Sequence, residues 1–579
     1  MTVSARFPDR VLQHRRLLPL DSDVARALHR WSLIWAAIVI VLLEVARRGR
    51  WLDHLPGADS AGMTARPVFV GLFLAGAILA WRWAIVGGVV AAFTASAVAV
   101  WEFQVLEFRD ALAVVLAFAV PGAMWVVLDL HDQRPARAVA GLVAVAVAVT
   151  SGGVVAAEMH DRFLGPTHPE SIATIDADLA TDWLWVGAVT PTSAVITAKL
   201  DAPAPDPVLV VEGSDGTRSR VVGSTDEHDV SRLELTGLSP ATDYQVALGD
   251  PNGLSGGGGP EATFRTFPEG PADFTIALGS CSRVGSNGAV FDAIRALEPE
   301  LFVIDGDFYY ANIDRNEPGL FREVLDLTLS RPGQSALYRT TPVAYVWDDH
   351  DYAGNNADRT AVTRPAVMEV YREYVPHYPL ADDGSPIYQA FDIGRVRVIV
   401  TDTRADRSPA SDPDGPDKTM LGDEQQAWLE QQLLAADDTS PLIIWVNPVP
   451  WIGSAEEGAD GWAGYSTERA ELANFITEHE IDGILVLSGD AHMVAIDDGG
   501  NTGYTSGGGD GFPLLHAGAL DRPGHMKGGP YSEGALPGSG QFGTVEVDDL
   551  GDRLHVRLAG RDWEGNELLA YEFDVTVPG

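Results

Sequence analysis

Apolar residues are spaced very differently in the first part of the chain and in the rest. Before residue 160 they form uncharged runs that are long enough, or nearly long enough, to cross a bilayer. These runs are Pro67–Trp81, Trp83–Trp101, Ala111–Leu128 and Ala138–Ala157, together with a shorter one, Trp31–Leu43. A soluble helix needs a polar face, which such runs lack. The pattern predicts a bundle of about five transmembrane helices within residues 1–162.

The arginines around these runs predict the orientation of the bundle. If the N-terminus lies inside the cell, nine arginines fall on the cytoplasmic side and five on the outer side, as the positive-inside rule favours. Five spans then place the chain after about residue 160 on the extracytoplasmic side of the cell membrane. If the short run Trp31–Leu43 does not span, that part faces the cytoplasm instead.

Short strands with alternating polarity, separated by Gly- and Pro-rich turns, follow between about Asp182 and Pro268. The predicted strands are Ala194–Leu200, Pro207–Glu212, Ser231–Leu235, Tyr244–Leu248 and Thr263–Thr266. The segment Leu235–Tyr244, with the sequence LTGLSPATDY, looks like the tyrosine corner of fibronectin-III-like modules. We therefore predict a fibronectin-III-like β-sandwich over residues 176–268.

Strands and helices alternate after Asp273. The short, uniformly apolar strands predict an α/β fold whose sheet is covered by helices. These strands are Phe274–Leu278, Leu301–Ile304, Val343–Trp347, Val396–Thr401, Leu442–Val446 and Gly483–Leu487. The predicted helices are Ala289–Leu297, Arg364–Val375, Asp423–Leu434 and Thr467–His479. Three closing antiparallel strands are expected at Thr544–Val547, Leu554–Leu558 and Leu568–Val575.

Charge follows the same division of the chain. Residues 1–162 hold 15 Arg, no Lys and 13 acids, whereas the other 417 residues hold 25 basic and 68 acidic side chains. A part with a net charge of −43 repels phosphate backbones, which argues against general nucleic-acid binding. The single cysteine excludes intramolecular disulfides and multi-cysteine zinc or iron–sulfur sites. No obligate protein partner is evident.

Residue types that bind metals follow four of the predicted strands. Functional groups of such sheets gather beyond the carboxyl ends of the strands, so we expect these residues to meet. In chain order they are Cys281, then Asp307 and Tyr310, then Asp348, Asp349, His350, Asn355 and Asn356, and finally Asp490 and His492. Carboxylates, imidazoles, amides and a thiol form a mixed donor set. Such a set suits a borderline or redox-capable ion beside a hard one.

Each group taken alone has an ordinary structural explanation. Asp307 would serve as a helix N-cap, His492 would lie on the surface, and Cys281 would be a small buried hydrophobe. The two asparagines are typical turn residues. The occurrence of all of them at four successive strand ends favours a common site.

These four motifs, in this order, resemble the PhoD-type alkaline phosphatases of the metallophosphoesterase superfamily. Three further segments agree with that family, namely Thr401–Arg404 (TDTR), Leu421–Leu429 (LGDEQQAWL) and Trp462–Arg469 (WAGYSTER). The resemblance covers about Asp182 to the C-terminus and does not cover residues 1–165. It implies a calcineurin-like αββα sandwich, with a metallophosphatase domain over residues 272–579.

The resemblance also implies Fe³⁺ next to one or more Ca²⁺ ions. By motif, Cys281 and Tyr310 would bind the ferric ion and Asp307 would bridge the metals. Asp490 would complete the harder site with one of the two asparagines, Asn355 or Asn356, and with Asp348 or Asp349 nearby. The motif does not show which of the two asparagines, or which of Asp348 and Asp349, takes this role.

Three residues are expected to act on the substrate. His492 would be a ligand or lie against the phosphate, and His350 would orient the leaving group or a ligand. Arg404 would either contact substrate oxygens or pair with a structural carboxylate.

The expected function is that of a membrane-anchored, metal-dependent hydrolase of phosphate monoesters or diesters. Two cations would clamp the phosphoryl oxygens and lower the pKa of a water, and the resulting hydroxide would attack phosphorus. Two alternatives stay open. One is a phospholipase or teichoic-acid phosphodiesterase at the cell surface. The other is a surface adhesion or sensing protein with a degenerate catalytic domain.

Overall fold

The structure, a computed structural model, describes residues 60–103, 119–120, 122–123, 135–166, 181–200, 206–249, 261–381, 386–437, 439–509 and 511–577. The chain forms two compact units. The first consists of Met1–Trp51 and Thr64–Glu158, and the second of Leu52–Met63 and Met159–Gly579. Apolar helices make up the described part of the first unit, and β-sheets with covering helices make up the second.

The helices of the first unit are α2 (Ser60–Arg82), α3 (Ala84–Phe103) and most of α5 (Pro135–Leu164). Small residues let them approach closely. A Cβ on Gly87 would lie 2.4 Å from the Cβ of Ala80, so α2 and α3 fold back on each other. A Cβ on Gly152 would lie 2.3 Å from the carbonyl oxygen of Phe93, so α5 packs on α3 backbone to backbone. Such contacts are common between membrane helices.

Among the described residues, one helical stretch is long and apolar enough to cross a membrane by itself, Val139–Asp161 of α5. The apolar stretches of α2 and α3, Val68–Ala80 and Val86–Val100, are shorter. The predicted run Trp31–Leu43 and most of Ala111–Leu128 lie outside the described residues. The multi-span bundle therefore stays a prediction.

A sandwich of two four-stranded layers begins the second unit. One layer is β1 (Thr181–Gly187), β2 (Ser193–Leu200), β6 (Val230–Thr236) and β5 (Ser224–Thr225). The other is β4 (Arg218–Val222), β3 (Val208–Gly213), β7 (Asp243–Gly249) and β8 (Ala262–Arg265). The Tyr244 hydroxyl accepts a 2.8 Å hydrogen bond from the backbone N–H of Ser239, as a tyrosine corner requires. Strands form over this part of the chain as predicted, and the fibronectin-III-like β-sandwich stays a prediction.

The first layer of the sandwich continues into a larger sheet, because Gly187 of β1 pairs in parallel with Val343 of β11. The resulting ten-stranded sheet has the order β21-β20-β19-β9-β10-β11-β1-β2-β6-β5. Its further strands are β9 (Phe274–Gly279), β10 (Leu301–Asp305), β11 (Val343–Val346), β19 (Phe542–Asp549), β20 (Arg553–Arg561) and β21 (Glu567–Thr576).

A seven-stranded sheet has the order β12-β13-β14-β15-β17-β16-β18. Its strands are β12 (Gln389–Ile393), β13 (Val396–Val400), β14 (Leu442–Val446), β15 (Ile484–Ser488), β16 (Met493–Asp497), β17 (Leu514–Ala517) and β18 (Gly534–Pro537). Apolar residues of both large sheets, such as Leu278, Ile444 and Val545, belong to one buried core. The α/β prediction is confirmed.

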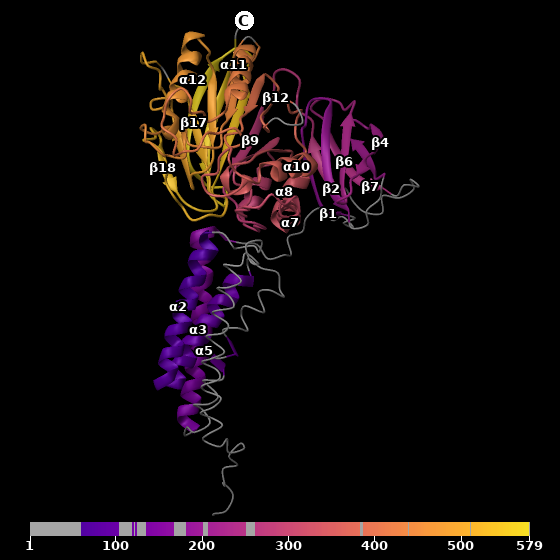
Figure 1. Ribbon diagram of the computed structural model, residues 1–579. Helices are drawn as coiled ribbons and strands as arrows, with labels where there is room; N and C mark the ends of the chain where they lie inside the picture. The colour runs from indigo at the N-terminus through magenta and orange to yellow at the C-terminus, as the bar shows by residue number, and fades with distance from the viewer. Residues whose placement is uncertain are drawn as a thin grey trace, which may run out of the picture. The chain divides into compact units, whose positions relative to one another are not determined.

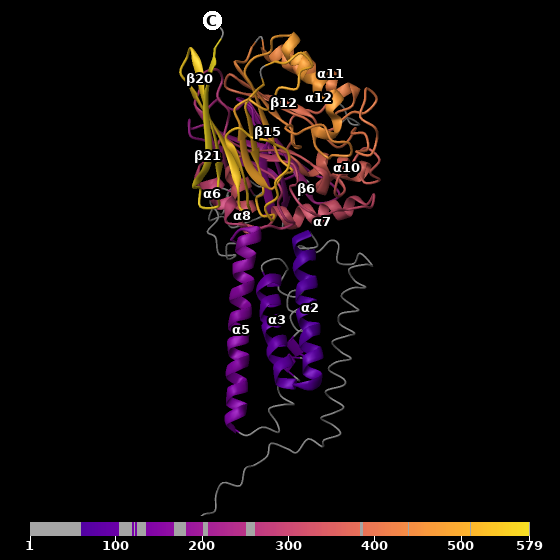
Figure 2. The ribbon, with the colours of Figure 1, turned by 90° about the vertical axis from the view of Figure 1, so that its left-hand side faces the viewer.

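Helices pack against both sheets. The sandwich strands lie beside α7 (Pro318–Leu329), α8 (Pro332–Thr340) and α10 (Arg364–Tyr374), as Figure 1 shows. Two shorter helices, α6 (Val290–Ala296) and α9 (Asp349–Tyr352), complete this group. In Figures 1 and 2, α11 (Asp423–Asp437) and α12 (Ser466–Glu478) lie next to each other along the seven-stranded sheet. A single 3₁₀ turn, η1 (Trp462–Tyr465), leads into α12.

Two tryptophans of β1 join the sandwich to these helices. The indole N–H of Trp183 donates to Oδ1 of Asp326 on α7 at 2.8 Å. The indole N–H of Trp185 donates at 2.8 Å to the carbonyl oxygen of Tyr374, the last residue of α10. Both indoles are fully buried. The sandwich and the α/β layers therefore share a core.

Replacing Trp185 by Ala is expected to lower the free energy of unfolding by about 3–5 kcal/mol, because it opens a cavity and removes the donor to Tyr374. Thermal unfolding of the full chain measures the change. Val222→Ala is the control, since this side chain of β4 is exposed and its loss is expected to cost less than about 0.5 kcal/mol. Equal melting temperatures for Trp185→Ala and the control would contradict a shared core.

Candidate metal centre

The candidate site lies where strands of both large sheets end. β9, β10 and β11 are parallel neighbours, so their carboxyl ends lie together. The end of β15 approaches from the other sheet, and a Cβ on Gly489 would lie only 2.0 Å from the carbonyl oxygen of Asp305. Glycine is required there because two backbones touch. The four predicted strand-end motifs thus meet in space.

Four of the predicted ligands have a left-handed backbone, Asn356 with a φ of 59° and three others at equivalent places beyond a strand. Cys281, Asp307 and Asp490 each lie two residues beyond a strand and adopt left-handed φ angles of 61°, 53° and 64°. This conformation costs roughly 1–2 kcal/mol for a residue with a Cβ, and such strain concentrates at functional sites. It turns the chain sharply at the strand end. The same turn would be free of strain with glycine, so the side chains are present for another reason.

Four carboxylates converge at these turns. One oxygen from each of Asp307, Asp348, Asp349 and Asp490 lies within 4.8 Å of the others, and Asp307, Asp349 and His350 form a second such group. All four carboxylates are buried. We refer to Asp307, Asp348, Asp349 and Asp490 as the acidic cluster.

A softer donor set adjoins the acidic cluster through Asp307. The Cys281 thiol lies 3.5 Å from Oδ2 of Asp307. The Tyr310 hydroxyl lies 2.9 Å from Nε2 of His492. Asp307 therefore lies between a thiol–phenol pair and the other carboxylates, which is the position a bridging ligand would need.

The residues present fit a pair of cations. Within the described part of the chain, Oδ2 of Asp348, Oδ1 of Asp349 and Oδ2 of Asp490 are buried without a hydrogen-bond donor. Burial, and then repulsion from Asp349, raises the pKa of Asp307. Burial, and then the charge of Asp307, raises the pKa of Cys281 and of Tyr310. Cations at the centre would satisfy these oxygens and reverse the repulsion.

Both site histidines are held through Nδ1. Nδ1 of His492 donates to the carbonyl oxygen of Pro523 at 2.7 Å, and Nδ1 of His350 lies 2.5 Å from Oδ1 of Asn312. In a neutral imidazole, Nε2 is then the acceptor. His350 also stacks on Tyr310, with ring centroids 3.9 Å apart, and its Nε2 lies 3.8 Å from Oδ1 of Asp349. Each imidazole therefore presents Nε2 toward a predicted metal ligand, His492 toward Tyr310 and His350 toward Asp349.

Arg404 pairs with carboxylates, the second of the two roles predicted for it, and contact with substrate stays a prediction. Its guanidinium is fully buried and binds Asp348 and both oxygens of Asp460. Arg407 binds the same Asp460. The charge of Asp348 is therefore partly offset, whereas Oδ1 of Asp349 has no hydrogen-bond donor among the described residues and only His350 within ion-pair distance.

The two asparagines are more peripheral than predicted. Both are exposed, and the Asn355 amide donates to Oδ1 of Asn356 at 2.9 Å. The link to the cluster is the backbone N–H of Asn356, which donates to Oδ2 of Asp349. Their role as ligands stays a prediction.

Several contributors were missed by sequence reasoning. Asn312 holds His350, Asp460 holds Arg404, and the guanidinium carbon of Arg522 lies 4.1 Å above the Tyr310 ring. Lys527 binds Asp490. The rarity of lysine, three in the whole chain, was the one signal that pointed to Lys527.

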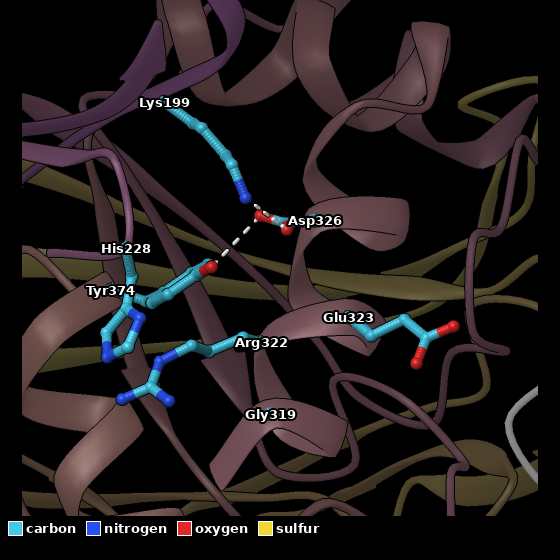
Figure 3. Close-up of a pocket in the computed structure, with 7 residues that line it drawn as sticks. All are labelled: Lys199, His228, Gly319, Arg322, Glu323, Asp326 and Tyr374. Carbon is cyan, nitrogen blue, oxygen red and sulfur yellow. Dashed lines mark hydrogen bonds and ion pairs between the residues drawn. The ribbon is translucent and has the colours of Figure 1, made fainter. Parts of the chain in front are cut away.

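A cleft of about 430 Å³ lies elsewhere, between the sandwich and α7 (Figure 3). Its lining residues are Lys199, His228, Gly319, Arg322, Glu323, Asp326 and Tyr374. Lys199 is bound to Asp326 at 2.6 Å, and Arg322 to Glu373 at 2.7 Å. Because Lys199 and Arg322 are held by carboxylates and none of the predicted ligands lines it, this cleft is a seam between layers and not the candidate site.

Replacing Gly489 by Ala is expected to remove bound metal and to destabilise the chain by about 2 kcal/mol, because the added Cβ would overlap the carbonyl oxygen of Asp305. Metal content by mass spectrometry and thermal unfolding measure the two effects. Gly415→Ala is the control, since nothing lies within 4 Å of its Cβ position. Unchanged metal content in Gly489→Ala would show that the close approach does not position Asp490.

Residues 276–509 match the family of PhoD-like phosphatases. This segment contains every predicted site residue. Alkaline phosphatase D of Bacillus subtilis (strain 168) is 27% identical over 188 residues, which cover 27% of this chain and 32% of that protein. The chain thus matches about a third of the length of this relative.

A solved structure of PhoD has a TM-score of 0.55 at 17% identity, over 71% of this chain and 92% of that one. This likeness shows a common fold. A purple acid phosphatase from yellow lupin seeds has a TM-score of 0.49 at 15% identity. This match covers 69% of this chain and 75% of that one.

Proposed function

We propose that this chain, whose residues 276–509 form a PhoD-like phosphatase domain, hydrolyses phosphate monoesters or diesters with bound metal ions. The observation that carries the proposal is the acidic cluster. Four buried carboxylates converge inside the matched segment, and three of them keep an oxygen without a donor among the described residues. Acids arranged in this way are costly unless cations bind them.

Two groups of residues would hold the ions. Asp307, Asp349 and Asp490 would supply hard oxygen ligands, and the resemblance assigns Ca²⁺ to this side. Cys281 and Tyr310 would supply thiolate and phenolate to Fe³⁺. When bound, the ions would provide an activated water and neutralise charge on the phosphoryl group.

The two histidines would accept a proton or orient a reacting group at this centre. Nε2 of His492 accepts the hydrogen bond of the Tyr310 hydroxyl, so it is the atom that receives this proton when the phenol ionises. The side chain of His350 is partly exposed. It is placed to orient the leaving group, whereas Arg404 acts by holding Asp348 in place.

We expect the full chain to hydrolyse p-nitrophenyl phosphate or bis-p-nitrophenyl phosphate at mildly alkaline pH, and a chelator to abolish turnover. Asp307→Asn is expected to retain less than about a tenth of the activity, because it removes the shared charged ligand. Initial rates and metal content measure both effects. Turnover that survives complete metal removal would contradict the proposal.

Asp552→Asn is the matched control, because this carboxylate is exposed and far along the chain from the cluster. It should leave activity unchanged. An ordered, metal-free chain without turnover would favour the alternative of a surface binding protein.

We further propose that α5 anchors the chain in the cell membrane and that the phosphatase domain lies on the extracytoplasmic side. The support is the length and apolarity of Val139–Asp161, together with the exposure of apolar side chains such as Leu142, Val143 and Val154. Such side chains are unfavourable in water and favourable in lipid.

The anchored chain is expected to stay in the membrane pellet after a wash with alkaline carbonate, because α5 would be buried in lipid. Protease added to intact cells should cleave the phosphatase domain. A cytoplasmic marker protein is the control for cell integrity. Recovery of the chain in the soluble fraction would refute the anchor, and protection from protease would reverse the orientation.

A further inference from the structure

Lys527 lies beside the acidic cluster, outside the segment matched to the phosphatase family. It belongs to the stretch between β17 and β18. Its Nζ is 2.5 Å from Oδ1 of Asp490, whose other oxygen, Oδ2, has no donor among the described residues. The carboxylate of Asp490 therefore lies between the Lys527 ammonium and the rest of the acidic cluster.

The backbone around Lys527 is held in place. The Tyr531 hydroxyl donates to the carbonyl oxygen of Lys527 at 3.0 Å. The next residue, Gly528, has a left-handed φ of 68°, and a Cβ there would lie 2.3 Å from the carbonyl oxygen of Ile452. Only glycine fits this approach. The base of the side chain is thus fixed, while its four-carbon stem keeps its own freedom.

Lys527 differs from the other cations around the cluster in its access to solvent. The side chain of Arg404 is fully buried between Asp348 and Asp460. Arg522 is fully buried over the ring of Tyr310. The Lys527 side chain is 35% exposed. Within the described part of the chain, it is the cation of this group that an anion from solvent can reach.

The partner of Lys527, Asp490, is also the carboxylate whose charge would be shared with a bound metal ion. Among the ion pairs of the described residues, Asp490 pairs with Lys527 alone. Once a cation binds Asp490, this carboxylate attracts the ammonium less strongly. A phosphoryl group arriving at the cations brings two or three oxygens that share its negative charge. The ammonium is then drawn toward the phosphoryl oxygens.

We propose that Lys527 contacts a non-bridging oxygen of the substrate phosphoryl group and favours monoesters over diesters, whereas the resemblance taken alone somewhat favours diesters. This inference rests on the proposed function. A monoester at alkaline pH carries two negative charges on the phosphoryl group, and a diester carries one, so a nearby cation stabilises the monoester more. Lys527 is then a residue that sets specificity.

The test compares Lys527→Met and Lys527→Arg in the full, metal-loaded chain. For Lys527→Met, kcat/KM is expected to fall about tenfold or more for p-nitrophenyl phosphate, and less than about threefold for bis-p-nitrophenyl phosphate. Lys527→Arg keeps the charge and should retain most of the activity on the monoester. Binding of inorganic phosphate, measured by calorimetry, should weaken about tenfold or more in Lys527→Met.

Lys199→Met is the matched control. Lys199 is also a partly exposed lysine bound to one aspartate, Asp326, but it lies in the cleft of Figure 3 and not at the cluster. Its substitution should leave the ratio of the two activities and phosphate binding unchanged. Metal content, measured for each variant, shows whether Asp490 still holds its ion.

Equal losses on both esters, loss of metal in Lys527→Met, or unchanged phosphate binding would each overturn the contact. A wild-type chain that hydrolyses neither ester would refute the proposed function instead. In that case, the calorimetric measurement of phosphate binding alone tests the contact between Lys527 and a phosphoryl group. Weaker binding in Lys527→Met but not in Lys199→Met would support the contact.

Discussion

Repulsion among buried carboxylates is the force to which the rest of this site responds. Four aspartates lie within 4.8 Å of one another with almost no access to water. Their mutual repulsion in a low-dielectric interior amounts to several kcal/mol. Arg404 offsets part of it at Asp348, and Lys527 offsets part of it at Asp490. In the described ion pairs Asp307 has no basic partner and Asp349 has only His350, so bound cations would supply the remaining counter-charge.

The backbone is shaped to keep these acids together. Left-handed turns at Cys281, Asp307 and Asp490 lie two residues beyond their strands, and the carboxylates of Asp307 and Asp490 meet in the acidic cluster. Gly306 and Gly489 allow the neighbouring loops to touch, with Cβ positions 2.6 Å from Asp348 and 2.0 Å from Asp305. The strain is supported by two large sheets whose cores are continuous. A rigid frame of this kind is what a metal site requires.

The strand-end motifs could be recognised from the sequence because ligand type and strand pattern are both local. The closing strands and the helices over Arg364–Val375 and Thr467–His479 were predictable for the same reason. The parallel pairing of β1 with β11 was not, since one residue pair, Gly187 with Val343, joins segments far apart in the chain. Nor was the supporting shell. Asp460, Arg522 and Lys527 lie in loops without periodicity, and their partners are set by tertiary packing alone.

The junction between β1 and α10 has a consequence for how the chain is made. The acceptor of the Trp185 indole N–H is the carbonyl oxygen of Tyr374, which follows it by 189 positions. At roughly 5–20 residues per second, a ribosome needs about 10 to 40 s to synthesise the segment between them. Phe308 and Tyr338, whose rings pack against Trp185, are synthesised earlier. The bond between β1 and α10 can therefore form only after the rings that pack on Trp185 have been synthesised.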